Sequence, residues 1–176
     1  MSTSSSKVVV VVEDEQLLAE KVGVRLEELV LDLISRQEFV SIGLSGGSMI
    51  DSLASIVPRL QLPWSRLRFF FVDERFVPFT SEESNFGNYQ TKLFRQLPLT
   101  DKNVIKIDPN LPSVEEVARD YEQRLAQLFS GDNKVDFFFF LTMRNGMFSS
   151  VALVVGHRSV GYGSRWSHCQ SLSRSR

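Results

Sequence analysis

The stretch FVSIGL (residues 39–44) is followed directly by SGGS (residues 45–48). The first six residues are typical of a buried strand, and the next four are typical of a turn. Residues 49–57 are predicted to form a short helix, which stops before Pro58. A strand, a glycine turn and a helix in immediate succession are the repeating unit of an α/β sheet.

The same alternation continues on both sides of this unit. Further strands are predicted over residues 7–12, 67–72, 103–107 and 134–141. Further helices are predicted over residues 18–33, over residues 84–96 and after the capping box of Ser113 and Glu116. Such alternation predicts a mainly parallel sheet covered on both faces, and such sheets bind ligands beyond the carboxyl ends of their strands. The loops after Leu44, Val72 and Ile107 are therefore the places for a site.

The composition narrows the class of protein. Of 176 residues, 43% are hydrophobic and 23% are charged, as in soluble globular proteins. A net charge of -1 excludes a strongly basic surface, so we expect no nucleic-acid partner. The single cysteine excludes a disulfide framework. The apolar runs are too short to span a bilayer and the first residues do not resemble a secretory signal, so we expect a cytoplasmic protein without a membrane partner.

The charge pattern divides the chain into two parts. No acidic residue follows Asp136, whereas five arginines follow Leu141, and the hydrophobic periodicity is lost from Thr142 onwards. We therefore expect an α/β unit over residues 1–141 and an unrelated, disordered tail over residues 142–176. The five arginines are too dispersed to favour a nucleic-acid arm.

The glycine turn is the first candidate site. Gly46 and Gly47 allow a sharp turn and a close approach to a ligand. The free N–H groups of the helix start, together with the hydroxyls of Ser45 and Ser48, suit a phosphate. The motif is neither a P-loop nor a GxGxxG fingerprint, and a tight turn without a ligand is the alternative interpretation.

Charged and polar residues follow the next strand. Asp73, Glu74 and Arg75 come at its carboxyl end, where Arg75 could clamp a phosphate by paired hydrogen bonds. The alternative is a solvated turn with a local ion pair. Asn85, at the start of the following helix, could also reach a ligand.

Metal and triad chemistry are not indicated. His157 and His168 lack metal-ligand spacing with Cys169, so we expect no metal site. The sequence offers no Ser/His/Asp set that can be placed in one site.

Four motifs occur together in a characteristic order and spacing. They are residues 41–48, FFVDERFVP (70–78), ESNFGNY (83–89) and DPNLP (108–112). As a set they resemble the 6-phosphogluconolactonases, over about residues 7–141, which is roughly the first half of such an enzyme. Glucosamine-6-phosphate deaminase is a more distant relative with a similar fold and glycine turn, but DERFVP favours the lactonase.

The resemblance implies a Rossmann-like three-layer α/β fold and a reaction. The family hydrolyses 6-phospho-D-glucono-1,5-lactone to 6-phosphogluconate in the oxidative branch of the pentose phosphate pathway, without a metal or cofactor. A water attacks the lactone carbonyl with help from a general base, and hydrogen-bond donors stabilise the oxyanion. The predicted substrate-binding residues are Ser45, Gly46, Gly47, Ser48, Asp73, Arg75 and Asn85. The oligomeric state is not implied.

The departure from the family lies in the tail. The base of the family is a histidine in a segment of the type GPDGHTASLFPG, which this sequence lacks. Residues 163–174, read one nucleotide later, can encode that segment at every position. We therefore expect a truncated chain with a frame-shifted tail, in which residues 142–162 are an unrelated insertion and no catalytic residue is carried over. Three hypotheses remain: a lactonase with another base, a non-catalytic phosphosugar-binding fragment, or a poorly folded product.

Overall fold

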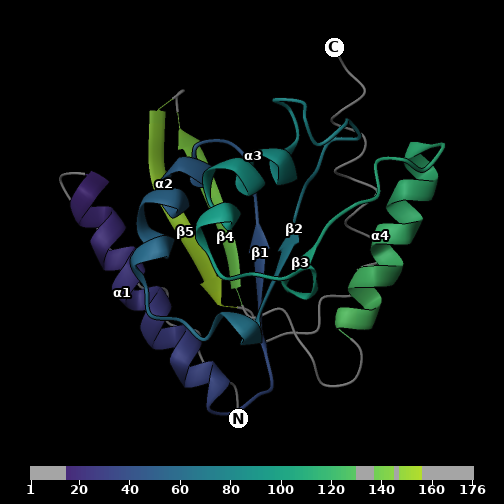
Figure 1. The fold of residues 1–176 in the computed structure, drawn as a ribbon. Helices are drawn as coiled ribbons and strands as arrows, with labels where there is room; N and C mark the ends of the chain where they lie inside the picture. Colours follow the sequence, from purple (N-terminus) through teal and green to yellow (C-terminus); the bar gives the residue numbers. More distant parts are fainter. Residues whose placement is uncertain (1–14, 130–136, 145–146, 156–176) are drawn as a thin grey trace, which may run out of the picture.

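The computed structural model describes residues 15–129, 137–144 and 147–155. These ranges contain a five-stranded sheet with the order β3-β2-β1-β4-β5 (Figure 1). The strands are β1 Val40–Leu44, β2 Leu67–Phe71, β3 Val104–Ile105, β4 Phe137–Arg144 and β5 Met147–Val155. The pairs β1–β2, β1–β4 and β2–β3 are parallel, and β4–β5 is antiparallel. The predicted mainly parallel α/β sheet is confirmed.

Four α-helices lie in the described ranges: α1 Glu15–Ile34, α2 Met49–Ile56, α3 Asn85–Lys92 and α4 Val114–Leu128. The single helix predicted over residues 84–96 is divided, because Leu93 departs from helical geometry and the chain continues as the 3-10 turn Phe94–Gln96. Ser113 caps α4 as predicted, by accepting a hydrogen bond from Glu116 N at 3.2 Å. No helix in the described ranges is long and apolar enough to cross a membrane.

Each face of the sheet has its own hydrophobic core. On one face, side chains of α1, α2 and α3 pack on alternate residues of the central strands, among them Leu44 and Phe71. On the other face, Tyr121 and Leu125 of α4 pack on Phe70 (Figure 1). β1 and β2 can occupy the centre because nearly all of their residues are buried.

The chain keeps regular structure beyond the expected boundary. We expected disorder from Thr142 onwards, but β4 continues to Arg144 and β5 pairs with it along its length. Its apolar stretch Val151–Val155 lies opposite β4, so β-propensity in this stretch outweighs the lost periodicity. The predicted strand 7–12, Asp14, residues 134–136 and the tail from residue 156 lie outside the described residues.

Arg66 connects the end of α1 to the start of the sheet. Its Nε donates to the backbone oxygen of Glu38 at 2.7 Å, and its Nη2 donates to the oxygens of Ile34 at 3.0 Å and of Gln37. These carbonyls belong to the last turn of α1 and the segment after it, where helical partners have run out. A cation at this end also stabilises the helix dipole.

We expect Arg66→Ala to lower the free energy of unfolding by about 1–3 kcal/mol, because charged donors to three carbonyls are lost. Denaturant unfolding measures this as a lower midpoint with an unchanged slope. Arg59→Ala is the matched control, since Arg59 is exposed and has no hydrogen bond or ion pair within the described ranges. Equal stabilities of the two variants would contradict this role.

Tyr121 continues the hydrogen bonding of β2 where β3 ends. β3 pairs with Phe69 and Phe70 only. At the next residue the Tyr121 hydroxyl accepts from Phe71 N at 2.7 Å and donates to Phe71 O at 3.0 Å. A side chain of α4 thereby satisfies a backbone donor and acceptor in the buried interior, which would otherwise remain unpaired.

We expect Tyr121→Phe to destabilise the fold by about 1–3 kcal/mol, because it leaves both groups of Phe71 buried without a partner while the ring still fills its site. Thermal unfolding followed by circular dichroism provides the measurement. An unchanged midpoint would show that water replaces the hydroxyl.

Candidate functional site

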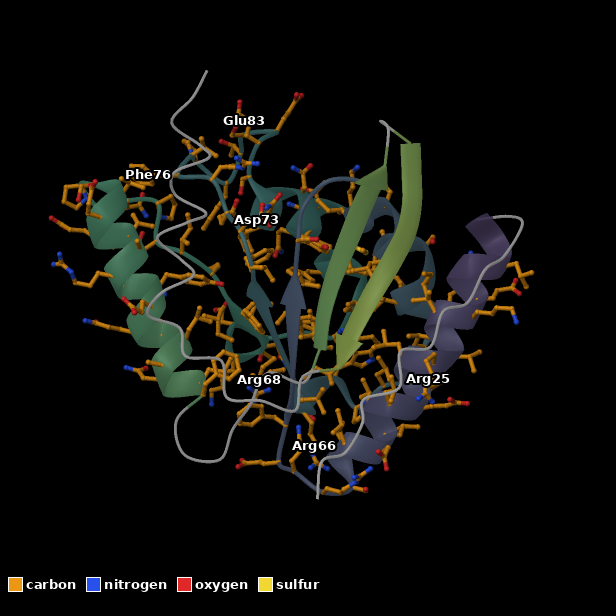
Figure 2. All side chains as sticks on the ribbon, turned by 180° about the vertical axis from the view of Figure 1, so that it is seen from behind. Arg25, Arg66, Arg68, Asp73, Phe76 and Glu83 are labelled. Carbon is orange, nitrogen blue, oxygen red and sulfur yellow. The ribbon has the colours of Figure 1, made fainter. Side chains whose placement is uncertain are left out.

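Parallel pairing brings two loops to one edge of the sheet. Leu44 lies opposite Phe71, and Val72 N donates to Leu44 O at 2.9 Å. Both chains therefore leave the sheet at the same level, β1 into the glycine turn and β2 into the turn at Asp73. Asp73 lies beyond the carboxyl ends of these strands, while Arg66 and Arg68 lie at the opposite end (Figure 2).

The glycine turn connects β1 directly to α2, which begins at Met49 with Ser48 as its N-cap. Gly47 has a φ of 74°, in the left-handed region that side chains rarely adopt. The first bonds of the helix run from Ile50 N to Gly47 O at 3.1 Å and from Ser52 N to Ser48 O at 3.2 Å. The predicted strand–turn–helix junction is therefore present.

Unpaired donors remain at this junction. Ser48 Oγ is buried and has no hydrogen-bond partner, and Ser48 does not cap the helix with its side chain. In the described part of the chain, the N–H groups of Gly46, Gly47 and Ser48 also form no hydrogen bond. Together with the positive end of the α2 dipole, these donors suit an anion.

Glu74 organises the loop after β2. Its Oε1 accepts hydrogen bonds from Arg75 N at 2.8 Å and Asn85 N at 2.7 Å, and its Oε2 accepts one from Phe86 N at 2.7 Å. The carboxylate therefore fastens the loop to the first turn of α3 and neutralises the positive end of that helix. The donors at the start of α3 are thus already used, in contrast to those at the start of α2.

Asn85 lies between the two loops. Its Nδ2 donates to Asp73 O at 2.8 Å and to Asp73 Oδ2 at 3.3 Å. A Cβ on Gly46 would lie 2.0 Å from Asn85 Oδ1, so the absence of a side chain at Gly46 is what lets Asn85 approach. Asp73, Asn85 and Gly46 are therefore one packed unit, as the prediction of a common site requires.

A hydrogen bond from Tyr89 attaches helix α3 to the glycine turn. One helical turn after Asn85, the Tyr89 hydroxyl donates to Ser45 O at 2.8 Å, and the ring is fully buried. Burial raises the pKa of Tyr89, and the negative charge of Asp73 raises it further. The hydroxyl therefore stays protonated and acts as a donor.

Arg75 is exposed, and within the described ranges its guanidinium has no ion pair or hydrogen bond. The alternative of a local ion pair in this turn is therefore not observed. Beyond β3, Asp108 Oδ1 accepts from Asn110 N and Asn110 Nδ2, both at 3.0 Å, which makes a local turn of its own.

Glu74 and Tyr89 position the loops of the site, and the sequence pattern does not predict either role. In the sequence Glu74 is one of three charged residues after a strand and Tyr89 is the last residue of the motif ESNFGNY, and neither position indicates its tertiary contacts. The signal available in the sequence was an acidic residue shortly before a predicted helix start. The free N–H groups of a helix start attract such a carboxylate. His157, His168 and Cys169 lie outside the described residues, in which no cluster of three or more metal-ligating side chains occurs.

We expect Gly46→Ala to displace the Asn85 side chain, because the new Cβ would overlap Asn85 Oδ1. The free energy of unfolding should fall by about 1–3 kcal/mol. In an Asn85→Ala background the same substitution should cost markedly less, because the obstructing amide is gone, and a double-mutant cycle by denaturant unfolding measures the difference. Additive effects would contradict the contact.

Comparisons with known proteins agree with the motifs. Residues 13–147 match the family described as glucosamine-6-phosphate isomerases/6-phosphogluconolactonase. The chain is 38% identical to human 6-phosphogluconolactonase over 125 residues, which are 65% of this chain and 48% of the human protein. It is 45% identical to the bovine 6-phosphogluconolactonase over 98 residues, or 53% of this chain and 38% of that protein.

Solved structures show the same fold. The 6-phosphogluconolactonase of Thermotoga maritima superposes with a TM-score of 0.61 at 26% identity, over 68% of this chain and 53% of that one. The enzyme of Trypanosoma brucei gives a TM-score of 0.60 at 28% identity, over 71% and 52%. This chain thus spans about half or less of the length of the relatives it matches. The resemblance carried by the motifs is confirmed, and the chain belongs to the glucosamine-6-phosphate isomerase/6-phosphogluconolactonase family.

Proposed function

We propose that the glycine turn and the Asp73 loop bind the phosphorylated sugar lactone on which 6-phosphogluconolactonases act, and that this chain by itself binds without hydrolysing it. The observation that carries the proposal is the buried Ser48 hydroxyl, which, like three amides beside it at the positive end of α2, has no hydrogen-bond partner among the described residues. Buried donors of this kind normally have a partner, so an unpaired one leaves a place that a ligand or an ordered water can fill.

Arg75, Asp73 and Asn85 add groups that can bind the charged and hydroxylated parts of a phosphosugar. Arg75, on the adjacent loop, has no ion pair with any described residue and can form two parallel hydrogen bonds to a phosphate or carboxylate. Asp73 retains a carboxylate that accepts hydrogen bonds from sugar hydroxyls, and Asn85 fixes its position through a contact of 3.3 Å. An anion-binding turn beside an acceptor for hydroxyls suits a phosphosugar.

Hydrolysis also needs a group that removes a proton from the attacking water. By family resemblance this group is a histidine after β4, and the sequence has no matching segment there. The acidic groups that could replace it are Asp73 and Glu74. The Glu74 carboxylate is engaged by the hydrogen bonds that hold the loop, and the Asp73 carboxylate is the proposed acceptor for the sugar hydroxyls. General-base assistance accelerates hydrolysis by about 10²–10⁴-fold, and we expect this chain to lack that acceleration.

Binding is tested with inorganic phosphate and with 6-phosphogluconate, the stable product, by isothermal titration calorimetry. We expect Ser48→Ala to weaken binding about 3- to 10-fold and Arg75→Ala about 10-fold or more, since the second loses a charged donor. Arg95→Ala is the matched control, because Arg95 is exposed and makes no polar contact in the described ranges. Equal losses in all three variants would contradict a site at the glycine turn.

Turnover is tested by following acid release from freshly prepared lactone. We expect the rate with this chain to equal the rate in buffer. A version in which the reading frame of the tail is restored, so that the histidine segment is present, is the positive comparison. Equal, enzyme-accelerated rates from both proteins would refute the loss of the base, whereas phosphate binding would remain a separate result.

The family description also includes glucosamine-6-phosphate isomerases, which is the second candidate. The similar proteins named above are lactonases, and this favours a lactone. Glucosamine 6-phosphate serves as the discriminating ligand in the calorimetric titration, and tighter binding than for 6-phosphogluconate would reverse the preference.

A further inference from the structure

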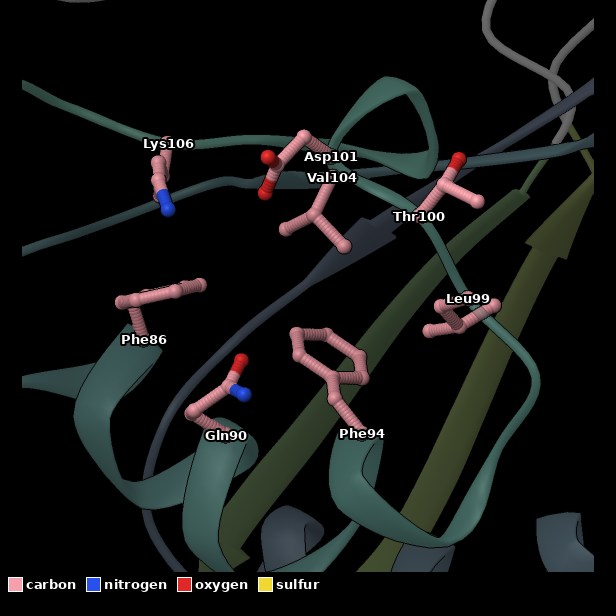
Figure 3. Close-up of a pocket in the computed structure, with 8 residues that line it drawn as sticks. All are labelled: Phe86, Gln90, Phe94, Leu99, Thr100, Asp101, Val104 and Lys106. Atoms are coloured by element: carbon pink, nitrogen blue, oxygen red, sulfur yellow. The ribbon is translucent and has the colours of Figure 1, made fainter.

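A cavity of about 390 Å³ lies beside the outer strand β3, between α3 and the segment from Leu99 to Lys106 (Figure 3). This volume is within the usual range of small-molecule sites. The cavity is separate from the glycine turn, because it is lined by Phe86 and Gln90 of α3, whereas Asn85 and Tyr89 of the same helix contact the other site.

Three polar side chains converge on one part of this cavity. Figure 3 shows the ammonium of Lys106, the carboxylate of Asp101 and the amide of Gln90 directed toward a common space. Lys106 Nζ is held 4.6 Å from the centre of the Phe86 ring. Among the described residues, Lys106 and Asp101 form no ion pair with each other or with another group, and the Gln90 amide forms no hydrogen bond.

The other part of the cavity is apolar. Phe94, Leu99 and Val104 line it, and Phe94 is itself nearly buried. The cavity thus combines a pair of opposite, unpaired charges with an adjoining apolar surface. A simple anion would use Lys106 alone, and a simple amine would use the exposed carboxylate of Asp101 alone. A ligand that carries both charges next to an apolar group satisfies every part of the lining.

We propose that this cavity binds a free α-amino acid with an apolar side chain. The carboxylate of the ligand lies at Lys106 and its ammonium at Asp101, with the Gln90 amide hydrogen-bonded to the ligand between them. Its side chain packs on Phe94, Leu99 and Val104. Free amino acids have both charges on one carbon, and a residue within a peptide chain does not, so an internal residue of a peptide does not fit. The proposal is independent of the lactone site.

The first test uses the full chain and three probes that differ in charge alone: L-phenylalanine, 3-phenylpropionate without the ammonium, and phenethylamine without the carboxylate. By calorimetry or ligand-observed NMR we expect a Kd for L-phenylalanine on the order of 1 mM, and binding of both analogues about 10-fold weaker. No binding of L-phenylalanine up to roughly 20 mM, or an analogue that binds equally well, would overturn the proposal.

The second test assigns each charge to its partner. Lys106→Met should weaken 3-phenylpropionate binding and spare phenethylamine, Asp101→Asn should do the reverse, and both should weaken L-phenylalanine about 10-fold. Lys102→Met is the matched control, because Lys102 is exposed next to Asp101 and does not line the cavity. A variant that has simply lost its fold loses all three ligands, and that pattern, or equal effects in the control, counts against the proposal. Saturating phosphate should leave the affinity for L-phenylalanine unchanged.

Discussion

The carboxylate of Glu74 accepts hydrogen bonds from the backbone N–H groups of Arg75, Asn85 and Phe86, and so joins the end of β2 to the start of α3. The positions of the other site residues follow from this junction. With α3 fixed, Asn85 reaches Asp73 and occupies the space above Gly46, and Tyr89 reaches Ser45 O one turn later. Removal of this carboxylate would leave three N–H groups unpaired and free the loop that carries Asp73 and Arg75.

The parallel register makes this junction possible. Because Leu44 and Phe71 are paired, the two loops leave the sheet side by side, and a single asparagine can contact both. The N-termini of α2 and α3 differ in whether a negative charge neutralises the helix dipole. The positive end of α3 is neutralised by Glu74, whereas the amides of Gly46 and Gly47 at the start of α2 remain unpaired in the described ranges. This difference between the two helix starts is the basis for the proposed anion site at the glycine turn.

The strands, helices and caps that depend on local sequence patterns could be predicted from the sequence. The run before the glycine turn, the helix from Met49 and the cap at Ser113 all follow from hydrophobic spacing and capping chemistry, and the structure has them. Tertiary contacts were not predictable in this way. The role of Glu74 depends on a helix start eleven residues away, and the bridge from Tyr121 to Phe71 spans fifty residues. The stretch Met147–Val155 lacks a periodic signal and is ordered by pairing with β4.

Helix α3 lies between two regions, with Asn85 and Tyr89 toward the glycine turn and Phe86 and Gln90 toward the cavity beside β3. Whether the two regions influence each other depends on the cost of moving this helix. Displacing its first turn would break the two bonds from Asn85 N and Phe86 N to Glu74, each worth about 1.5–3 kcal/mol because one partner is charged, and also the bond from Asn85 Nδ2 to Asp73 O. A millimolar ligand supplies about 4 kcal/mol in total, and only its differential affinity for two states can shift them. A ligand in the cavity therefore lacks the free energy to move α3, and occupation of one region should leave the geometry of the other unchanged.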